Sequence, residues 1–97
     1  MTSIAGTLHW IPMEAHGPTA PFLYKRICAF AYVGSDLQTE SAILVEGLEP
    51  GKETCAVEAH WVDGYPELAA SQGDVVTLIA AHRPIATIEV GSVRAAA

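Results

Sequence analysis

The sequence predicts an all-β protein of six short strands that form a small sandwich or barrel. Its apolar runs are short and alternate with a period of two, which places one face of each run inside and the other outside. Clusters of turn-forming residues separate these runs at regular intervals, as is typical of small sandwiches and barrels. The turn clusters are His16-Gly17-Pro18, Gly34-Ser35-Asp36, Glu49-Pro50-Gly51-Lys52, Asp63-Gly64-Tyr65-Pro66, Gln72-Gly73-Asp74 and His82-Arg83-Pro84.

The length of 97 residues indicates a single domain with one core. We expect the barrel to occupy about residues 7–93 and the end of the chain, 94–97, to fray. No apolar stretch approaches the roughly 18 residues that span a bilayer. The N-terminus lacks both the basic segment and the apolar core of an export signal. We therefore expect a cytoplasmic protein that makes no contact with membranes.

The first three strands are expected at Thr7–Met13, at about Leu23–Val33 and at about Ser41–Glu46. In the second strand both faces are largely apolar from Ile27 onward, so one side should meet the core and the other a neighbour or a loop. The segment 49–52 follows the third strand and reads as a tight turn, because proline presets φ and glycine supplies positive φ.

The remaining elements are a fourth strand, a helical turn and a closing hairpin. Residues 66–73 resemble a single helical turn, with proline at the start and glycine after the end. In the hairpin, Ile88 and Val90 are expected to point inward. In the fourth strand, the residues expected to face the core are Cys55, Val57, Ala59 and Trp61.

The two cysteines, Cys28 and Cys55, both fall within expected strands. Their spacing is not CxxC, so it supports neither a redox dithiol nor a zinc knuckle. We expect both to be buried free thiols that act as small hydrophobes. A disulfide between neighbouring strands stays open only for an oxidising compartment.

The charge balance argues against nucleic acid as the main partner. Five basic residues stand against eleven acidic ones, which gives a net charge of −6. Binding to phosphates needs clustered Lys and Arg. From Asp36 to Asp74 there are nine acids, and Lys52 is the one base. We expect no DNA contact, and an RNA contact would have to use Lys25-Arg26, Arg83 or Arg94.

No residue pattern indicates catalysis, a cofactor or a metal. The sequence has no phosphate-binding loop and no nucleophile elbow. Carboxylate pairs such as Glu46 with Glu49 and Glu53 with Glu58 border turns, where solvated acids are usual. The histidines have no ligand spacing; they are His9, His16, His60 and His82. An enzyme or ligand-binding barrel remains an alternative, with a pocket at the barrel mouth lined by His9, His60 or His82.

The order of the landmarks resembles the C-terminal β-barrel domain of elongation factor Tu and of its eukaryotic counterpart. Residues 18–22, Pro-Thr-Ala-Pro-Phe, are similar to that family's His-Thr-Pro-Phe loop, and Tyr24-Lys25-Arg26 follows where the family has Tyr-Arg-Pro. Phe30-Ala31-Tyr32 resembles the aromatic strand, and Ser35-Asp36-Leu37 resembles a Thr-Asp-Val turn. Glu49-Pro50-Gly51-Lys52 stands at the Met-Pro-Gly-Asp turn. The likeness spans about Leu8 to Val93.

The resemblance implies a small six-stranded antiparallel closed β-barrel. In the family this barrel packs on a second barrel, contacts aminoacyl-tRNA and does not itself bind GTP. In a stand-alone chain the apolar face used for that packing would be exposed, so self-association is also expected. The sequence departs from the family at the tip of the last hairpin. The family has a glycine-rich Gly-Gly-Arg turn there, and this chain has His82-Arg83-Pro84.

The function expected from these observations is a non-catalytic binding module with a protein partner or a second copy. Aromatic and arginine side chains supply a disproportionate share of interface energy. The alternative is a translation-associated protein that contacts tRNA. The candidate partner-binding residues are Phe22, Tyr24, Lys25, Arg26, His82 and Arg83.

Overall fold

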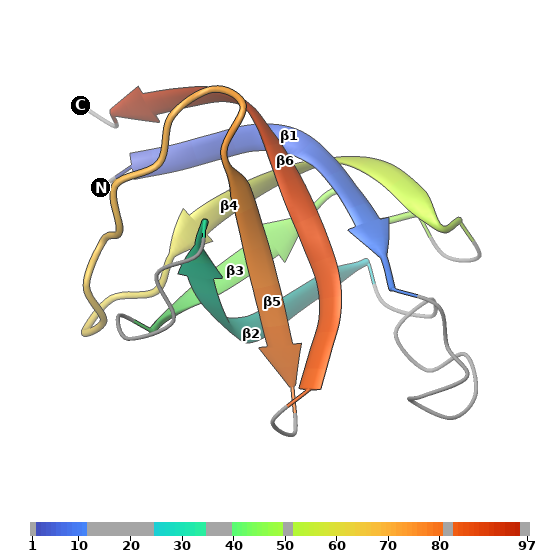
Figure 1. Ribbon diagram of the computed structural model, residues 1–97, viewed down its shortest axis with the longest axis horizontal. Coiled ribbons are helices and arrows are strands. Elements are labelled where there is room, and N and C mark those ends of the chain that lie inside the picture. The colour runs from blue at the N-terminus through green and yellow to red at the C-terminus, as the bar shows by residue number, and fades with distance from the viewer. Residues whose placement is uncertain (1, 12–24, 35–39, 50–51, 81–82, 96–97) are drawn as a thin grey trace.

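The computed structural model describes residues 2–11, 25–34, 40–49, 52–80 and 83–95. Within these ranges it contains six strands and no helix, and the strands close into an antiparallel barrel in the order β1-β4-β3-β2-β5-β6 (Figure 1). The predicted fold class is therefore confirmed. The strands are β1 (Thr2–Trp10), β2 (Arg26–Val33), β3 (Ser41–Glu46), β4 (Thr54–Trp61), β5 (Val75–Ala80) and β6 (Arg83–Ala95).

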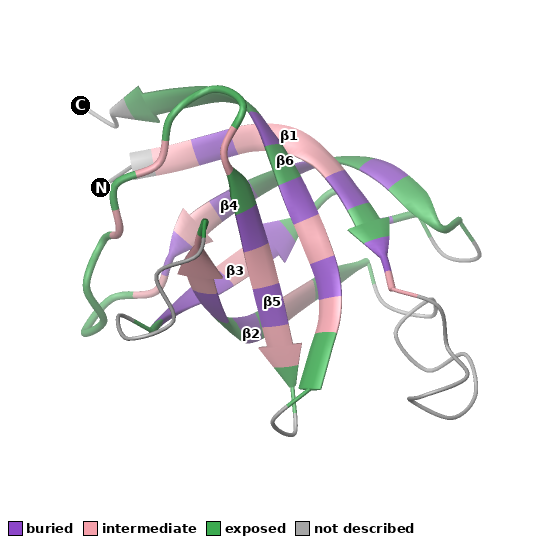
Figure 2. Cartoon of the chain, viewed as in Figure 1, coloured by how far each residue is buried: buried purple, intermediate pink, exposed green. Residues whose placement is uncertain are grey.

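Burial alternates along the strands, as Figure 2 shows for β4, β5 and β6. All four residues of β4 that were expected to face inward are buried, and so are Ile88 and Val90 of β6. Inward side chains from all six strands form one apolar cluster, because each strand contributes every second residue to the interior. The largest fully buried apolar side chains are Ile4, Leu8, Ile43, Leu78, Ile88, Val45, Val76 and Val90.

The pairing of β1 with β6 extends the barrel beyond the expected limits of 7–93. It runs from Thr2 opposite Ala95 to Trp10 opposite Ala86, with a shift in register between Ala5 and Gly6. Residues 12 and 13 of the expected first strand, and 96–97 of the expected frayed end, lie outside the described residues. At the register shift the two strands approach so closely that a Cβ on Gly6 would lie 2.3 Å from the Glu89 carbonyl oxygen.

The helical turn expected at residues 66–73 is wrong, because the β4–β5 connection is irregular throughout. Leu68 and Ala70 both pack against the apolar cluster. Their spacing of two residues suits an extended segment, whereas a helix would turn them to different sides. The loop is fixed to β3, since the buried Ser41 hydroxyl donates a hydrogen bond to the Pro66 carbonyl.

The two cysteines differ in burial. Cys55 is buried as expected, but Cys28 is exposed, and both thiols are free. The register explains the difference, because Cys28 stands opposite Leu44 on the outer face of the β2–β3 pair. No helix within the described ranges is long and apolar enough to cross a bilayer.

Candidate binding face

The residues that the sequence marked as partner-binding fall into two groups. Phe22, Tyr24 and His82 lie outside the described residues. Lys25 and Arg26 are exposed where β2 begins, and Arg83 is exposed where β6 begins, opposite Ala80 of β5. Neither Lys25 nor Arg26 forms an ion pair with any described residue.

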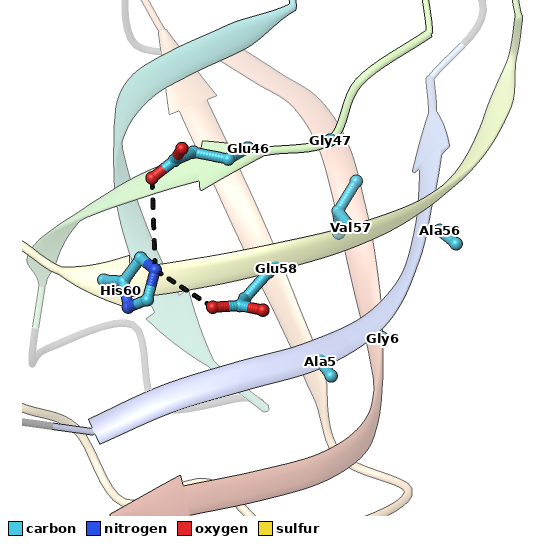
Figure 3. Close-up of a pocket in the computed structure, with 8 residues that line it drawn as sticks. All are labelled: Ala5, Gly6, Glu46, Gly47, Ala56, Val57, Glu58 and His60. Atoms are coloured by element: carbon cyan, nitrogen blue, oxygen red, sulfur yellow. Dashed lines mark ion pairs between the residues drawn. The ribbon is translucent and has the colours of Figure 1, made fainter. Parts of the chain in front are cut away.

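One depression on the outer wall is acidic and contains His60. It spans β1, β4 and the end of β3 and has a volume of about 480 Å³. As Figure 3 shows, the carboxylates of Glu46 and Glu58 converge on the same ring nitrogen. His60 Nε2 lies 3.4 Å from Glu58 Oε1 and 4.0 Å from Glu46 Oε1.

The geometry of this acidic depression indicates a solvated charge cluster. Glu46 and Glu58 stand directly opposite each other on β3 and β4. Like charges in that position repel, and both carboxylate side chains keep about half or more of their surface exposed to water, at 49% and 62%. Within the described part of the chain, no group of three or more His, Cys, Asp or Glu side chains is arranged to hold a metal ion. His9, in contrast, is exposed on β1 beside Thr54, with Nδ1 3.4 Å from Thr54 Oγ1.

A second depression is apolar and lies on the outer wall where β2 and β5 separate. We call it the seam groove. Its volume is about 400 Å³, and none of the described residues that line it is charged. Its walls come from β2, from Ala42 of β3, from the end of β5 and from the loop after β4. The residues lining the seam groove are Cys28, Ala29, Phe30, Ala42, Val62, Tyr65, Ile79 and Ala80.

Two aromatic rings stand in the wall of the seam groove. Phe30 of β2 and Tyr65 of the β4–β5 loop meet edge to face, with ring centroids 6.3 Å apart. Phe30 keeps 48% of its surface exposed, and Tyr65 keeps 46%. Neither ring belongs to the buried apolar cluster, because Phe30 is on the outer face of β2.

Backbone hydrogen bonds hold the Tyr65 end of the groove in place. The Val62 N–H donates to the Ala42 carbonyl at 2.9 Å, and the Tyr65 N–H donates to the Val62 carbonyl at 3.1 Å. The Ser41–Pro66 hydrogen bond lies immediately beside them. Tyr65 is thus carried by a loop that is attached to β3 at two neighbouring positions, and the groove is preformed.

Beside the seam groove, part of the β2 edge has no strand partner among the described residues, and we call this part the open edge. The Lys25 carbonyl accepts from the Leu48 N–H, on the side of β3, whereas the Gly34 N–H donates to the Val75 carbonyl, on the side of β5. Since backbone groups alternate in direction along a strand, the even-numbered residues of β2 face β5. Pairing with β5 covers only Phe30 to Val33. Among the described residues, no strand pairs with the β5-facing backbone groups of Arg26 and Cys28.

A third depression, of about 290 Å³, lies at the end of the barrel where β1 begins and β4 ends. It is lined by Ile4, Trp61, residues 67–70 and Val93, and neither His9 nor His60 contributes to it. Trp61 is buried, and its indole Nε1–H has no hydrogen-bond partner among the described residues. Of the histidines expected to line a pocket at the barrel mouth, His60 lines the acidic depression and a further one of about 440 Å³ where β4 ends, whereas His82 lies outside the described residues. An enzyme or ligand-binding barrel therefore stays an alternative.

The sequence predicted a partner-binding role for the start of β2 but not for the residues that follow it. Cys28, Phe30 and Tyr32 share the outer face of the strand. The sequence did contain a sign of these residues. Both faces of β2 are apolar from Ile27 onward, so each face needs a neighbour that shields it from water. In the described structure the inner face meets the core, and the outer face carries the seam groove.

No family model, curated protein or solved structure matches this chain. The resemblance to the C-terminal barrel of elongation factor Tu therefore rests on the order of the sequence landmarks, and it stays a prediction.

Proposed function

We propose that this protein is a non-catalytic binding module and that the seam groove is the face that contacts its partner. The observation that carries the proposal is the half-exposed Phe30–Tyr65 pair beside an uncharged groove. Full burial of one large apolar side chain contributes roughly 1.5–3 kcal/mol. Aromatic residues in preformed pockets are also the usual centres of binding energy in protein interfaces.

The chemistry of the groove favours a protein partner over a nucleic acid. Phosphate binding depends on several Lys or Arg side chains, and among the described residues none lines the groove. Arg26 and Lys25 lie near one end of it, where they are suited to the polar rim of a protein interface. The tRNA contact implied by the resemblance would instead place the binding energy on these two cations.

The experiment is affinity capture from a lysate of the source cells with immobilised wild-type protein, Phe30→Ser and Val75→Ser. Val75 is a matched control, since it is 41% exposed on the outer face of β5 away from the groove. The proposal predicts a protein that wild type and Val75→Ser both retain after nuclease treatment and that Phe30→Ser loses.

Two results would overturn the proposal. One is a partner that is retained equally by all three proteins, which would place the contact elsewhere. The other is capture that disappears after nuclease treatment, which would favour RNA. Circular dichroism of each variant checks that it is folded. If Phe30→Ser fails to fold, Tyr65→Ser replaces it, because Tyr65 is on a loop outside the strand ladder.

A further inference from the structure

We propose that the seam groove takes an extended peptide segment of a partner protein, that this segment pairs with the open edge of β2, and that its apolar side chains are flanked by acidic ones. This inference rests on the proposed function and names the occupant of the same face. Three observations converge on it: the open edge of β2, the apolar depression beside that edge, and two cations at its end, Lys25 and Arg26, that form no ion pair with any described residue.

The open edge supplies the main-chain contacts. The backbone N–H and C=O groups of Arg26 and Cys28 point toward the β5 side, beyond the last β2–β5 pair at Phe30 and Ile79. Both residues are exposed. An extended segment placed there would complete the ladder by strand addition, in which main-chain hydrogen bonds give affinity and side-chain pockets give specificity.

The seam groove supplies the side-chain pocket. Cys28 and Ala29 line it from β2, and Ile79 and Ala80 line it from β5, so the groove spans the place where the two strands part. Alternate side chains of an added strand point to the same face of the sheet. Every second residue of the segment would thus lie over the groove, and an aliphatic or aromatic side chain there would contact Phe30 and Tyr65.

The positive charges at the start of β2 favour acidic residues on either side of the apolar residues of the peptide. Lys25 and Arg26 are exposed and form no ion pair with any described residue. Glu46 stands opposite Arg26 in the register, but its carboxylate turns toward His60 on the other side of β3 (Figure 3). Carboxylates next to the apolar residues of the peptide would complement these cations.

The test uses four synthetic eight-residue peptides in a nuclear magnetic resonance titration of the full chain. They combine an alternating Val/Ile core or a Ser-substituted core with Glu or Lys flanks. We expect the Glu-flanked apolar peptide to bind best, and to protect the amides of Arg26 and Cys28 from hydrogen exchange. A version N-methylated on the edge that faces β2 should lose binding, because it cannot form the ladder hydrogen bonds.

Two variants with matched controls separate the contributions. Arg26→Glu should lower the affinity for the Glu-flanked peptide about fivefold to tenfold and raise the affinity for the Lys-flanked peptide. Arg94→Glu, the same change at the far end of β6, should leave both affinities unchanged. Phe30→Ser should weaken the apolar peptides about tenfold or more, and Val75→Ser should not.

The outcomes distinguish this inference from the proposed function. Binding of the peptide without protection of Arg26 and Cys28, or without a preference for Glu flanks, overturns the inference. So does failure of all four peptides to bind while a captured partner is still lost with Phe30→Ser, and the proposed function then stands. If the Phe30-dependent capture also fails, both are overturned. Salt-sensitive binding of tRNA that Arg26→Glu abolishes would overturn both in favour of RNA.

Discussion

Phe30 and Tyr65 lie edge to face on the outside of the barrel, with ring planes at 68° and centroids 6.3 Å apart. Thirty-five positions separate them in the sequence, and the hydrogen bonds from the β4–β5 loop to β3 bring them together. Edge-to-face pairs of this kind contribute about 0.5–1.5 kcal/mol beyond the area they bury. The pair therefore keeps an apolar surface fixed in position while about half of it remains available for contact.

A double-mutant cycle on this pair should show a coupling free energy at the low end of that range, about 0.5 kcal/mol, because both rings are half exposed. The measurement is urea unfolding of wild type, Phe30→Ala, Tyr65→Ala and the double variant. Each single variant should lose no more than about 1 kcal/mol. A loss of 3 kcal/mol or more from either would mean that the residue is part of the core.

Ser41→Ala should loosen the loop that carries Tyr65. The Ser41 hydroxyl is buried and donates to the Pro66 carbonyl, so its removal should lower the free energy of unfolding by about 1 kcal/mol. Hydrogen exchange of the Tyr65 amide should accelerate, and peptide affinity at the seam groove should fall in parallel. The control is Ser92→Ala, which changes an exposed serine of β6. Unchanged exchange at Tyr65 would show that this hydrogen bond does not position the ring.

How well the sequence predicts which side chains are buried in a strand depends on whether the two faces of that strand differ in polarity. The alternation in β4, from Cys55 to Trp61, follows from a period of two, and it was correctly predicted because both faces have distinct chemistry. In β2 both faces are apolar, so the pattern cannot tell the core from an exposed groove, and Cys28 was wrongly expected to be buried. The Phe30–Tyr65 pair depends on a tertiary contact that no local pattern contains.

The segment of residues 66–73 shows, in a loop, the same limit of prediction from local sequence patterns. Its proline and glycine are typical of a short helix, but Leu68 and Ala70 gain contact with the apolar cluster in an extended conformation. Packing overrides the local preference here. The extension of the β1–β6 pair to Thr2 and Ala95 was missed for a related reason, since the pairing register is a long-range property.

Gly6→Ala should destabilise the barrel by about 1–3 kcal/mol, because the added methyl group would meet the backbone of β6 at Glu89 and neither strand can move independently. The measurement is the urea midpoint at constant slope. Ala5→Ser is the matched control, since Ala5 is the neighbouring residue of β1 and lines the acidic depression on the outer wall. A Gly6→Ala protein as stable as wild type would contradict the close pairing at the β1–β6 register shift.

The two thiols should react at very different rates. Cys28 is exposed and Cys55 is buried, so a disulfide reagent that reports released thiolate should detect one thiol in the native protein and two after denaturation. Cys28→Ser should abolish the reaction of the native protein and leave one reactive thiol, that of Cys55, in the denatured protein. Two reactive thiols in the native state would contradict the burial of Cys55, and none would contradict the outward position of Cys28 opposite Leu44.

Lys52 should titrate at higher pH than a free lysine. A hydrogen bond and the charge of Glu49, at an Nζ–Oε2 distance of 2.5 Å, raise the Lys52 pKa above 10.5. Since the charged form is favoured in the fold, the contribution of the pair is complete below pH 10.5 and is lost as the pH rises through the raised pKa. Carbon-13 titration of the Lys52 side chain checks this. Glu49→Gln should lower the pKa, and an unchanged value would show that the pair does not persist in solution.

The most direct test of the seam groove as the binding face is amide hydrogen exchange of the full chain with and without the partner isolated by the Phe30-dependent capture. The account predicts that protection increases at Arg26, Cys28 and Tyr65. It also predicts no change around Glu58 and His60, on the opposite side of β3. Protection confined to Glu58 and His60, with none along β2, would contradict it.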